Sequence, residues 1–402
     1  MPRGVPCVCV FLPVSHGATD MTLSQGGHHD TPFSQSELIS SKGYPVEDYE
    51  VTTTDGFVLK IQRIPHGKED PLCPPKKNRK EVAFLQHGLL GSSADWVINF
   101  PSQSLGFTLA DAGYDVWLGN VRGNTYSRHL HYTREDSEFW NFSFDQMIEY
   151  DLPATLAFVL KVAGANKLHY VGHSQGTLIM FGLLSERPKY KEKIKLFTAL
   201  APVTTLIYAR SPIRLLTPFA EEISLLLRLL GNEGFLTNDQ IIKLFADIVC
   251  TVDATKPVCE LPLTILYGSN PKQRNETRLP VYINHIPAGT SVKYLVHFAQ
   301  LIKQKAFQKF DYGPEKNKLK YGQARPPRYD VSKVAAPVAL YWSQNDLFAD
   351  PKDVSLLRSK LPNVVLYYRV PDKQFTHLDF AYGIHANRNL YPVVLRTLRN
   401  HD

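Results

Sequence analysis

The chain has 402 residues, of which 44% are hydrophobic and 21% are charged, and its formal net charge is +7. This composition is that of an ordinary globular protein, and with only five cysteines it excludes collagen-like, disordered and disulfide-dense classes. A chain of this length exceeds one usual core, so we expect either one large α/β domain with a substantial insertion or two domains.

Residues 1–37 are rich in Gly, Ser, His and Pro and show no periodicity, so we expect a leader and a disordered arm. The apolar stretch 5–14 follows Arg3 and resembles a weak secretory signal, interrupted by Pro6 and Pro13. An irregular N-terminus is the alternative. No apolar run reaches the roughly 18 residues that a spanning helix needs, so we expect a protein that is not integral to the membrane.

Short apolar runs alternate with helical patterns from residue 50 onward. The strands that we expect are residues 50–53, 57–64, 82–86, 115–118, 167–171, 197–201, 338–342 and 364–370. The dipeptide Asp55-Gly56 predicts a hairpin between the first two. Helices are expected at 144–162, with a kink at Pro153, and at 177–184. This alternation predicts a mainly parallel central sheet covered by helices on both faces.

Residues 204–327 break the alternation, because they read as helices and loops between two sheet strands. We therefore expect an α/β core formed by residues 38–203 and 328–402, with 204–327 inserted as a helical cap. A leucine-rich patch within this insertion, at 225–230, fits the interior of a cap or a contact with lipid.

The sequence GHSQG at 172–176 follows an expected strand and precedes an expected helix. In a nucleophile elbow the serine occupies a strained strand-to-helix turn, and glycines on either side leave room for the backbone. Ser174 is thus the candidate nucleophile. A serine that caps the helix is the alternative interpretation.

A serine nucleophile needs a base within hydrogen-bond reach and a carboxylate that orients the base, in the chain order Ser, acid, His. Asp346 follows the strand at 338–342, and His377 follows the strand at 364–370. Both loops are expected at the carboxyl edge of the sheet, as is the elbow. An Asx turn for Asp346 and a surface loop for His377 are the alternatives.

Four other residues lie near these two candidates. Asp350 and Asp353 are expected at the start of the next helix, where carboxylates favour the helix dipole. Asp379 could support His377 indirectly, and His385 lies further along the chain.

The negative oxygen of a tetrahedral intermediate is held by two backbone N–H groups. One is expected from Gln175, which follows the nucleophile, and the other from Leu89, in the loop after the strand at 82–86.

The cysteines and basic clusters point to few additional sites. Cys250 and Cys259 enclose a short loop and are the expected disulfide pair, whereas no CxxC unit suggests a metal. The basic clusters at 76–80, 189–195 and 316–320 come with no nucleic-acid-binding motif, so we expect solvated loops and no nucleic-acid partner. Weak attraction to anionic lipid or to an acidic matrix stays open.

The chain resembles the acid lipase family, which includes gastric lipase, lysosomal acid lipase and arthropod relatives. The motifs that carry this resemblance are GYP at 43–45, RIPHG at 63–67, QHGL at 86–89, GNVRGNT at 119–125, YDLPA at 150–154, GHSQG at 172–176, PAGTS at 287–291, NDL at 345–347, ADP at 349–351 and HLDF at 377–380. They occur in order from about residue 38 to the C-terminus.

The resemblance implies an α/β-hydrolase fold with a helical cap and a lid, and hydrolysis of triacylglycerols and possibly cholesteryl esters. By position, the family triad falls on Ser174, Asp346 and His377. The oxyanion donors fall on Leu89 and Gln175. No metal or organic cofactor is implied.

The resemblance also implies a cap disulfide between Cys250 and Cys259 and glycosylation at Asn275, within the sequon Asn-Glu-Thr. Asn141 lies in a second sequon, but its aromatic neighbours lead us to expect burial. A secreted or lysosomal protein follows from the resemblance.

The leading hypothesis is therefore a serine ester hydrolase that cleaves neutral lipids at an oil–water or membrane interface. A small-ester carboxylesterase or an acyltransferase with the same triad is the second. A lipid-binding or storage protein on a hydrolase scaffold is the non-enzyme alternative, and such proteins usually lack one triad member.

Overall fold

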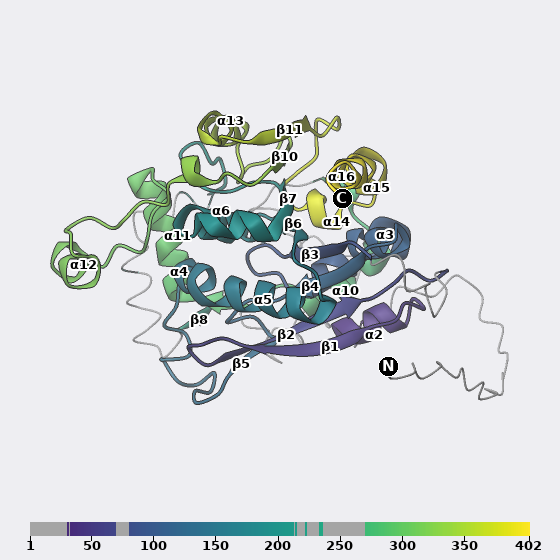
Figure 1. Ribbon diagram of the computed structural model, residues 1–402, viewed down its shortest axis with the longest axis horizontal. Coiled ribbons are helices and arrows are strands. Elements are labelled where there is room, and N and C mark those ends of the chain that lie inside the picture. The colour runs from purple at the N-terminus through teal and green to yellow at the C-terminus, as the bar shows by residue number, and fades with distance from the viewer. Residues whose placement is uncertain are drawn as a thin grey trace, which may run out of the picture.

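A computed structural model describes residues 30, 31, 33–69, 80–212, 214, 222, 233–235 and 270–402 (Figure 1). All five cysteines lie outside these residues, so the predicted pair Cys250 and Cys259 does too. The same is true of the possible signal at 5–14 and of the leucine-rich patch at 225–230.

The core of the molecule is a nine-stranded sheet in the order β1-β2-β4-β3-β6-β7-β10-β11, with β5 paired to β2. Its strands are β1 (Glu47–Thr52), β2 (Phe57–Ile64), β3 (Val82–Gln86), β4 (Asp115–Gly119), β5 (Ser127–His129), β6 (Leu168–His173), β7 (Ile194–Leu200), β10 (Val338–Trp342) and β11 (Val364–Arg369). The strands from β4 to β11 are parallel, and β1, β2 and β5 are antiparallel additions.

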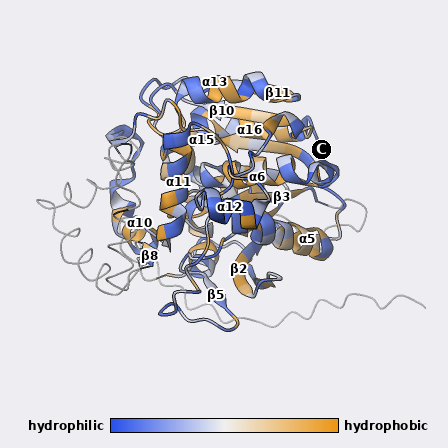
Figure 2. Ribbon diagram, turned by 90° about the vertical axis from the view of Figure 1, so that its left-hand side faces the viewer, coloured by the Kyte–Doolittle hydropathy of each residue, from blue (hydrophilic) through white to orange (hydrophobic). Residues whose placement is uncertain are grey.

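The central strands form a parallel sheet because their side chains are apolar on both faces. Every residue of β3, β4 and β6 is buried, as expected where helices cover both sides. In Figure 2, β3 and β10 are coloured mostly as hydrophobic. The predicted hairpin is confirmed, since β1 and β2 pair around Gly56, whose φ of +95° glycine adopts without strain.

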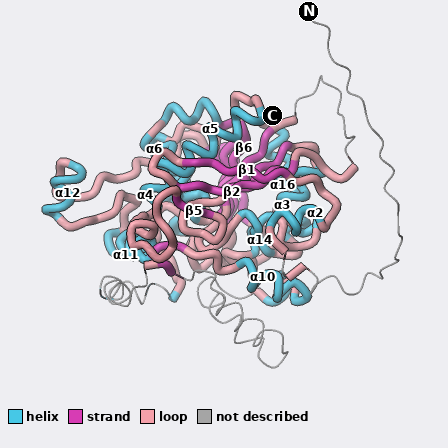
Figure 3. The backbone as a smooth tube through the Cα atoms, turned by 90° about the horizontal axis from the view of Figure 1, so that it is seen from below, coloured by secondary structure: helices cyan, strands magenta, loops and turns pink. Residues whose placement is uncertain are grey.

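Helices cover the two faces of the sheet (Figure 3). On one side lie α5 (Leu152–Ala163) and α6 (Gln175–Glu186), and on the other lies α3 (Leu105–Asp111), against which α16 (Tyr391–Arg399) packs. The expected α/β fold with a mainly parallel sheet and helices on both faces is thus confirmed.

The structure describes further helices and strands around this sheet. They are α2 (Gln35–Ser40), α4 (Phe144–Gln146), α10 (Leu279–His285), α11 (Val292–Gln304), α12 (Pro314–Tyr321), α13 (Pro351–Lys360), α14 (Asp379–Tyr382), α15 (Ala386–Asn389), the strands β8 (Gly234–Phe235) and β9 (Thr290–Ser291), the 3₁₀ helices η1 (Ser93–Trp96), η2 (Pro101–Gln103), η4 (Pro188–Lys193), η6 (Pro271–Gln273), η7 (Glu276–Arg278) and η8 (Val331–Lys333), and the π-helical turn η3 (Met147–Asp151). In Figure 1, α12 projects from the body of the molecule.

The helix expected at 144–162 is divided into α4, η3 and α5. Pro153 lacks an N–H group and cannot donate to the preceding turn, so the chain widens there into a π turn rather than a simple kink. Helix α2 begins inside the arm expected at 1–37, because Ser34 and Glu37 form a capping box.

Candidate active site

Ser174 stands between β6 and α6, at the strand-to-helix turn that the sequence predicts. Its φ of 52° and ψ of −112° are strained for a residue with a side chain, as expected in a nucleophile elbow. A Cβ at Gly172 would come within 2.8 Å of the backbone of Gly176, and one at Gly176 would collide with the carbonyl of Gln86. Both glycines are therefore required sterically. Ser174 occupies the N-cap position of α6, but its side chain makes no capping hydrogen bond to the helix and is left for other contacts.

The three candidate catalytic side chains meet although they come from distant parts of the chain. His377 Nε2 lies 2.7 Å from Ser174 Oγ, and His377 Nδ1 lies 2.8 Å from Asp346 Oδ2. All three residues are at most 2% exposed. With Nδ1–H donating to the carboxylate, Nε2 is left to accept the serine proton. This arrangement suits nucleophilic attack by Ser174.

Asp346 is held as a carboxylate. Burial acts to raise its pKa, but His377 and the backbone N–H groups of Phe348 and Ala349 outweigh it, and the pKa lies below its ordinary value. Both N–H groups donate to Oδ1 at 2.8 Å. The Asx-type turn that we considered as an alternative is therefore present as well, and it fixes the carboxylate that orients His377. His377 is buried and is not a surface-loop residue.

The loop after β3 lies against the elbow. A Cβ at Gly88 would lie 3.4 Å from Ser174 Cβ and 2.9 Å from His173 Nδ1, so only glycine lets this backbone approach so closely. Among the described residues, the N–H groups of Leu89 and Gln175 donate no hydrogen bond. Both remain candidates for an oxyanion hole.

Two buried histidines beside the site were missed by the sequence reasoning. His173 Nε2 lies 2.9 Å from the backbone oxygen of His377, and burial lowers the pKa of His173 to about 3. Burial likewise lowers the pKa of His87 to about 4, and its Nδ1 lies 2.7 Å from the oxygen of Gly88. Each neutral imidazole donates one N–H group. His173 thereby fixes the backbone carbonyl of His377, and His87 fixes the backbone carbonyl of Gly88. His87 lies in the QHGL motif and His173 in the GHSQG motif, and this placement is the signal by which the sequence could have indicated them.

The four rival residues take other positions. Asp350 is the N-cap of α13 and Asp353 lies in its first turn, as predicted. Asp379 accepts the N–H of Thr376 at 2.6 Å, close to the base but not on it. His385 precedes α15, and its backbone N–H donates to Gln273.

Of the two glycosylation sequons, the one at Asn141 differs from expectation. Asn275 is half-buried, and its Nδ2 donates to Gln103 at 3.2 Å. The expected burial of Asn141 is wrong: its side chain is exposed, while Phe142 and Ser143 on its C-terminal side are buried. The aromatic ring packs inward and leaves the amide at the surface, where Lys293 Nζ donates to it at 2.8 Å.

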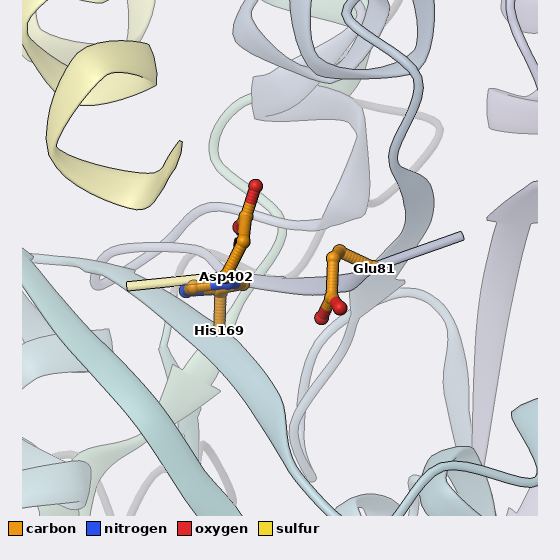
Figure 4. Close-up of side chains that lie close together, drawn as sticks. All are labelled: Glu81, His169 and Asp402. Carbon is orange, nitrogen blue, oxygen red and sulfur yellow. Dashed lines mark hydrogen bonds and ion pairs between the residues drawn. The ribbon is translucent and has the colours of Figure 1, made fainter. Parts of the chain in front are cut away.

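Glu81, His169 and Asp402 lie close together (Figure 4). Glu81 directly precedes β3 and His169 is the second residue of β6, so the cluster lies at the amino edge of the sheet. One potential ligand atom from each lies within 4.8 Å of the others. However, Lys195 forms an ion pair with Glu81, while His169 Nε2 lies 2.9 Å from Asp402. Tyr114 also donates to Asp402, at 3.2 Å. These contacts already satisfy the acidic groups.

No helix in the described part of the chain is long and apolar enough to cross a membrane.

Family comparison finds two matching descriptions. Residues 35–100 match the "Partial alpha/beta-hydrolase lipase region", and residues 84–380 match the "alpha/beta hydrolase fold". A solved structure described as a putative lipase from Sulfolobus solfataricus aligns with a TM-score of 0.55 over 89% of this chain and 99% of its own. At 14% identity, that likeness concerns the fold alone.

Similar curated proteins share a much higher identity. Gastric triacylglycerol lipase of Homo sapiens is 43% identical, over 91% of this chain and 90% of its own length. Lysosomal acid lipase/cholesteryl ester hydrolase of Homo sapiens is 41% identical over 98% of each. Lipase lipl-1 of Caenorhabditis elegans is 41% identical, over 93% of this chain and 94% of its own.

Proposed function

The chain belongs to the family of gastric and lysosomal acid lipases within the α/β-hydrolases, and on this basis we propose that it hydrolyses neutral lipid esters through an acyl-serine intermediate. It is a carboxylic ester hydrolase. The observation that carries the proposal is the hydrogen-bonded row of Ser174, His377 and Asp346.

In the first half of the proposed reaction, His377 Nε2 takes the proton of Ser174 as Oγ attacks the ester carbonyl carbon. The carbonyl electron pair moves onto its oxygen, which the N–H groups of Leu89 and Gln175 receive. His377 then gives its proton to the alcohol oxygen as the C–O bond breaks. The alcohol leaves, and the acyl group remains on Ser174.

In the second half, water replaces the alcohol. His377 takes a proton from the water as its oxygen attacks the acyl carbon, and returns that proton to Ser174 Oγ when the fatty acid leaves. Asp346 stays ionised throughout and stabilises the imidazolium of His377. The low pKa of Asp346 supports this role, because the carboxylate stays charged under acidic conditions.

The substrate is proposed to be triacylglycerol, and possibly cholesteryl ester, presented at an oil–water or membrane interface. The names of the relatives support these two classes. The residues at 204–327 are proposed as the cap and lid that select between them, within a core of residues 38–203 and 328–402. We further propose secretion or lysosomal residence, a disulfide between Cys250 and Cys259, and glycosylation at Asn275.

Initial rates on emulsified trioctanoin, emulsified cholesteryl oleate and dissolved p-nitrophenyl acetate test this function. A lipase gains activity once trioctanoin exceeds its solubility and forms an interface. Activity on the dissolved ester alone would indicate a small-ester carboxylesterase. If the protein hydrolysed none of the three esters, the proposal would be overturned and a lipid-binding protein would be favoured.

A further inference from the structure

Two stretches of the segment at 204–327 are hydrogen-bonded to the loop after β10 that carries Asp346 (the acid loop) and to the loop after β11 that carries His377 (the base loop). In the first stretch, the backbone N–H groups of Arg210 and Ser211 donate to the oxygen of Leu347, at 2.7 and 3.0 Å. Arg210 Nη2 donates to the backbone oxygen of Asp346 at 2.9 Å, and its Nε donates to Asp350 at 2.8 Å. Residues 210 and 211 are therefore attached to the acid loop.

The second stretch, residues 270–273, is attached to the base loop. Asn270 Nδ2 donates to the backbone oxygen of Gln374 and to Asp379 Oδ2, both at 3.0 Å. The same Asp379 Oδ2 accepts the N–H of Thr376, the residue before His377, at 2.6 Å. Asn270 thus holds the base loop at one point before His377 and at one point after it.

The oxygen of Gln374 is a common point of these contacts. Besides Asn270, it accepts a hydrogen bond from Asn345 Nδ2 at 3.1 Å, and Asn345 adjoins the catalytic acid. The acid loop, the base loop and Asn270 of the insertion therefore share a single carbonyl.

Asn270 is suited to this task because it is inside the protein. Its side chain is 5% exposed, Asp379 is also 5% exposed, and His377 is fully buried. Burial raises the pKa of Asp379 to about 6, so the group is sensitive to the loss of a donor. A hydrogen bond in such surroundings constrains its partners more strongly than one in water.

We propose that Asn270 is a positioning residue for His377, which couples the cap to the catalytic base. This inference rests on the proposed ester hydrolase function. The bond from His377 Nε2 to Ser174 Oγ tolerates little displacement, and a misplacement of about 1 Å lowers a rate roughly 100-fold. Asn270 prevents that displacement by fixing both the Gln374 carbonyl and the Asp379 carboxyl group.

The test compares kcat and KM of Asn270→Ala with those of the wild-type chain on dissolved p-nitrophenyl butyrate. We expect kcat to fall by about 10- to 100-fold, with KM within about twofold, because Asn270 acts on the base and not on the substrate. Asn363→Ala is the matched control. It removes a similar amide-to-carbonyl bond, from Asn363 to Ala335, at the opposite end of β11, and should leave both constants unchanged.

A reversed pair separates positioning from general loss of stability. Asn270→Asp alone places two carboxyl groups together and should lower kcat, whereas adding Asp379→Asn restores a donor and an acceptor in reverse order. The double variant should recover at least part of the lost kcat, with thermal midpoints followed in parallel. The comparison of the double variant with Asn270→Asp also tests the inference if Asn270→Ala does not fold.

A wild-type kcat in Asn270→Ala, or a double variant no more active than the single Asn270→Asp, would overturn the inference. A wild-type chain without any esterase activity would instead overturn the proposed function, and this inference with it. Because the wild-type rate is measured first, the two failures are distinguished.

Discussion

His377 Nε2 lies 2.7 Å from Ser174 Oγ, although 203 positions separate the two residues in the chain. The sheet order β6-β7-β10-β11 explains this proximity, because Ser174 follows β6 and His377 follows β11. Parallel strands present their carboxyl ends at one edge of a sheet. The long separation along the chain therefore becomes a short one in space.

Replacing the acid tests the orientation of the base. Asp346→Asn should lower kcat by about 10³- to 10⁴-fold, because an amide favours the wrong histidine tautomer. Steady-state kinetics on p-nitrophenyl butyrate measures the change. Asp330→Asn, which alters an exposed N-cap before η8, is the control and should retain the wild-type kcat. Equal losses in both variants would argue against a specific role for Asp346.

Gly88 allows the backbone of the oxyanion loop to approach the nucleophile. Gly88→Ala should lower kcat strongly, since its Cβ would meet His173 Nδ1 at 2.9 Å and displace the loop. Gly313→Ala provides the contrast, because its φ of +85° makes alanine strained but no atom lies within 4 Å of the new Cβ. That control should lose about 1 kcal/mol of stability and no activity. An active Gly88→Ala enzyme would contradict the assigned position of the loop.

Arg122 forms a buried ion network with two carboxylates. It donates to Asp151 at 2.6 Å and to Asp55 at 2.7 Å, and both Arg122 and Asp151 are almost fully buried. Arg122→Ala would leave a buried carboxylate without its cation and should lower the free energy of unfolding by about 3–5 kcal/mol. Arg128→Ala removes an exposed pair with Glu50 and should change it by less than about 1 kcal/mol. Urea denaturation of both variants measures the difference.

Asp95 makes stability depend on pH. Burial raises its pKa from 3.8 to about 7, against the lowering effect of hydrogen bonds from Ser92 and Tyr382. Between pH 4 and 7 the folded chain therefore binds more protons at this site than the unfolded chain. Its contribution to stability is complete below about pH 4 and is lost as the pH rises towards and past 7. The total is on the order of 4 kcal/mol, at about 1.4 kcal/mol for each pKa unit.

Asp95→Asn should remove this dependence and become more stable than the wild type as the pH rises from 4 to 8. Urea denaturation at several pH values measures the free energy of unfolding of both proteins. Asp136→Asn is an informative control, because hydrogen bonds from Thr133 lower the pKa of Asp136 and give the opposite sign. An unchanged pH slope in Asp95→Asn would exclude Asp95 as its source.

Much of the site could be predicted because its signals are local. Strands β3 and β10 have the predicted bounds, since each is a continuous apolar run that ends at a polar loop. The glycines around Ser174 report a steric need of the turn itself, so they mark the elbow in the sequence. Asp346 and His377 could be chosen because each directly follows a predicted strand.

Other features depend on contacts that no short window contains. β5 has three residues and forms only by pairing with β2, so the sequence offers too little periodicity to find it. Asn270 meets Asp379 across 109 positions, and His173 meets His377 across 204. These groups gain their importance from the folded neighbours, and neither motif spacing nor hydrophobic pattern reveals such partners.

The most direct test of the central claim is mass-spectrometric mapping of the protein after partial reaction with a fluorophosphonate, with trioctanoin hydrolysis followed in the same samples. We predict a single adduct on Ser174, and a loss of lipase activity in proportion to the fraction labelled. Labelling should become very slow in His377→Ala, because the base that activates the serine is missing. Full trioctanoin hydrolysis with Ser174 completely modified, or in Ser174→Ala, would contradict the account.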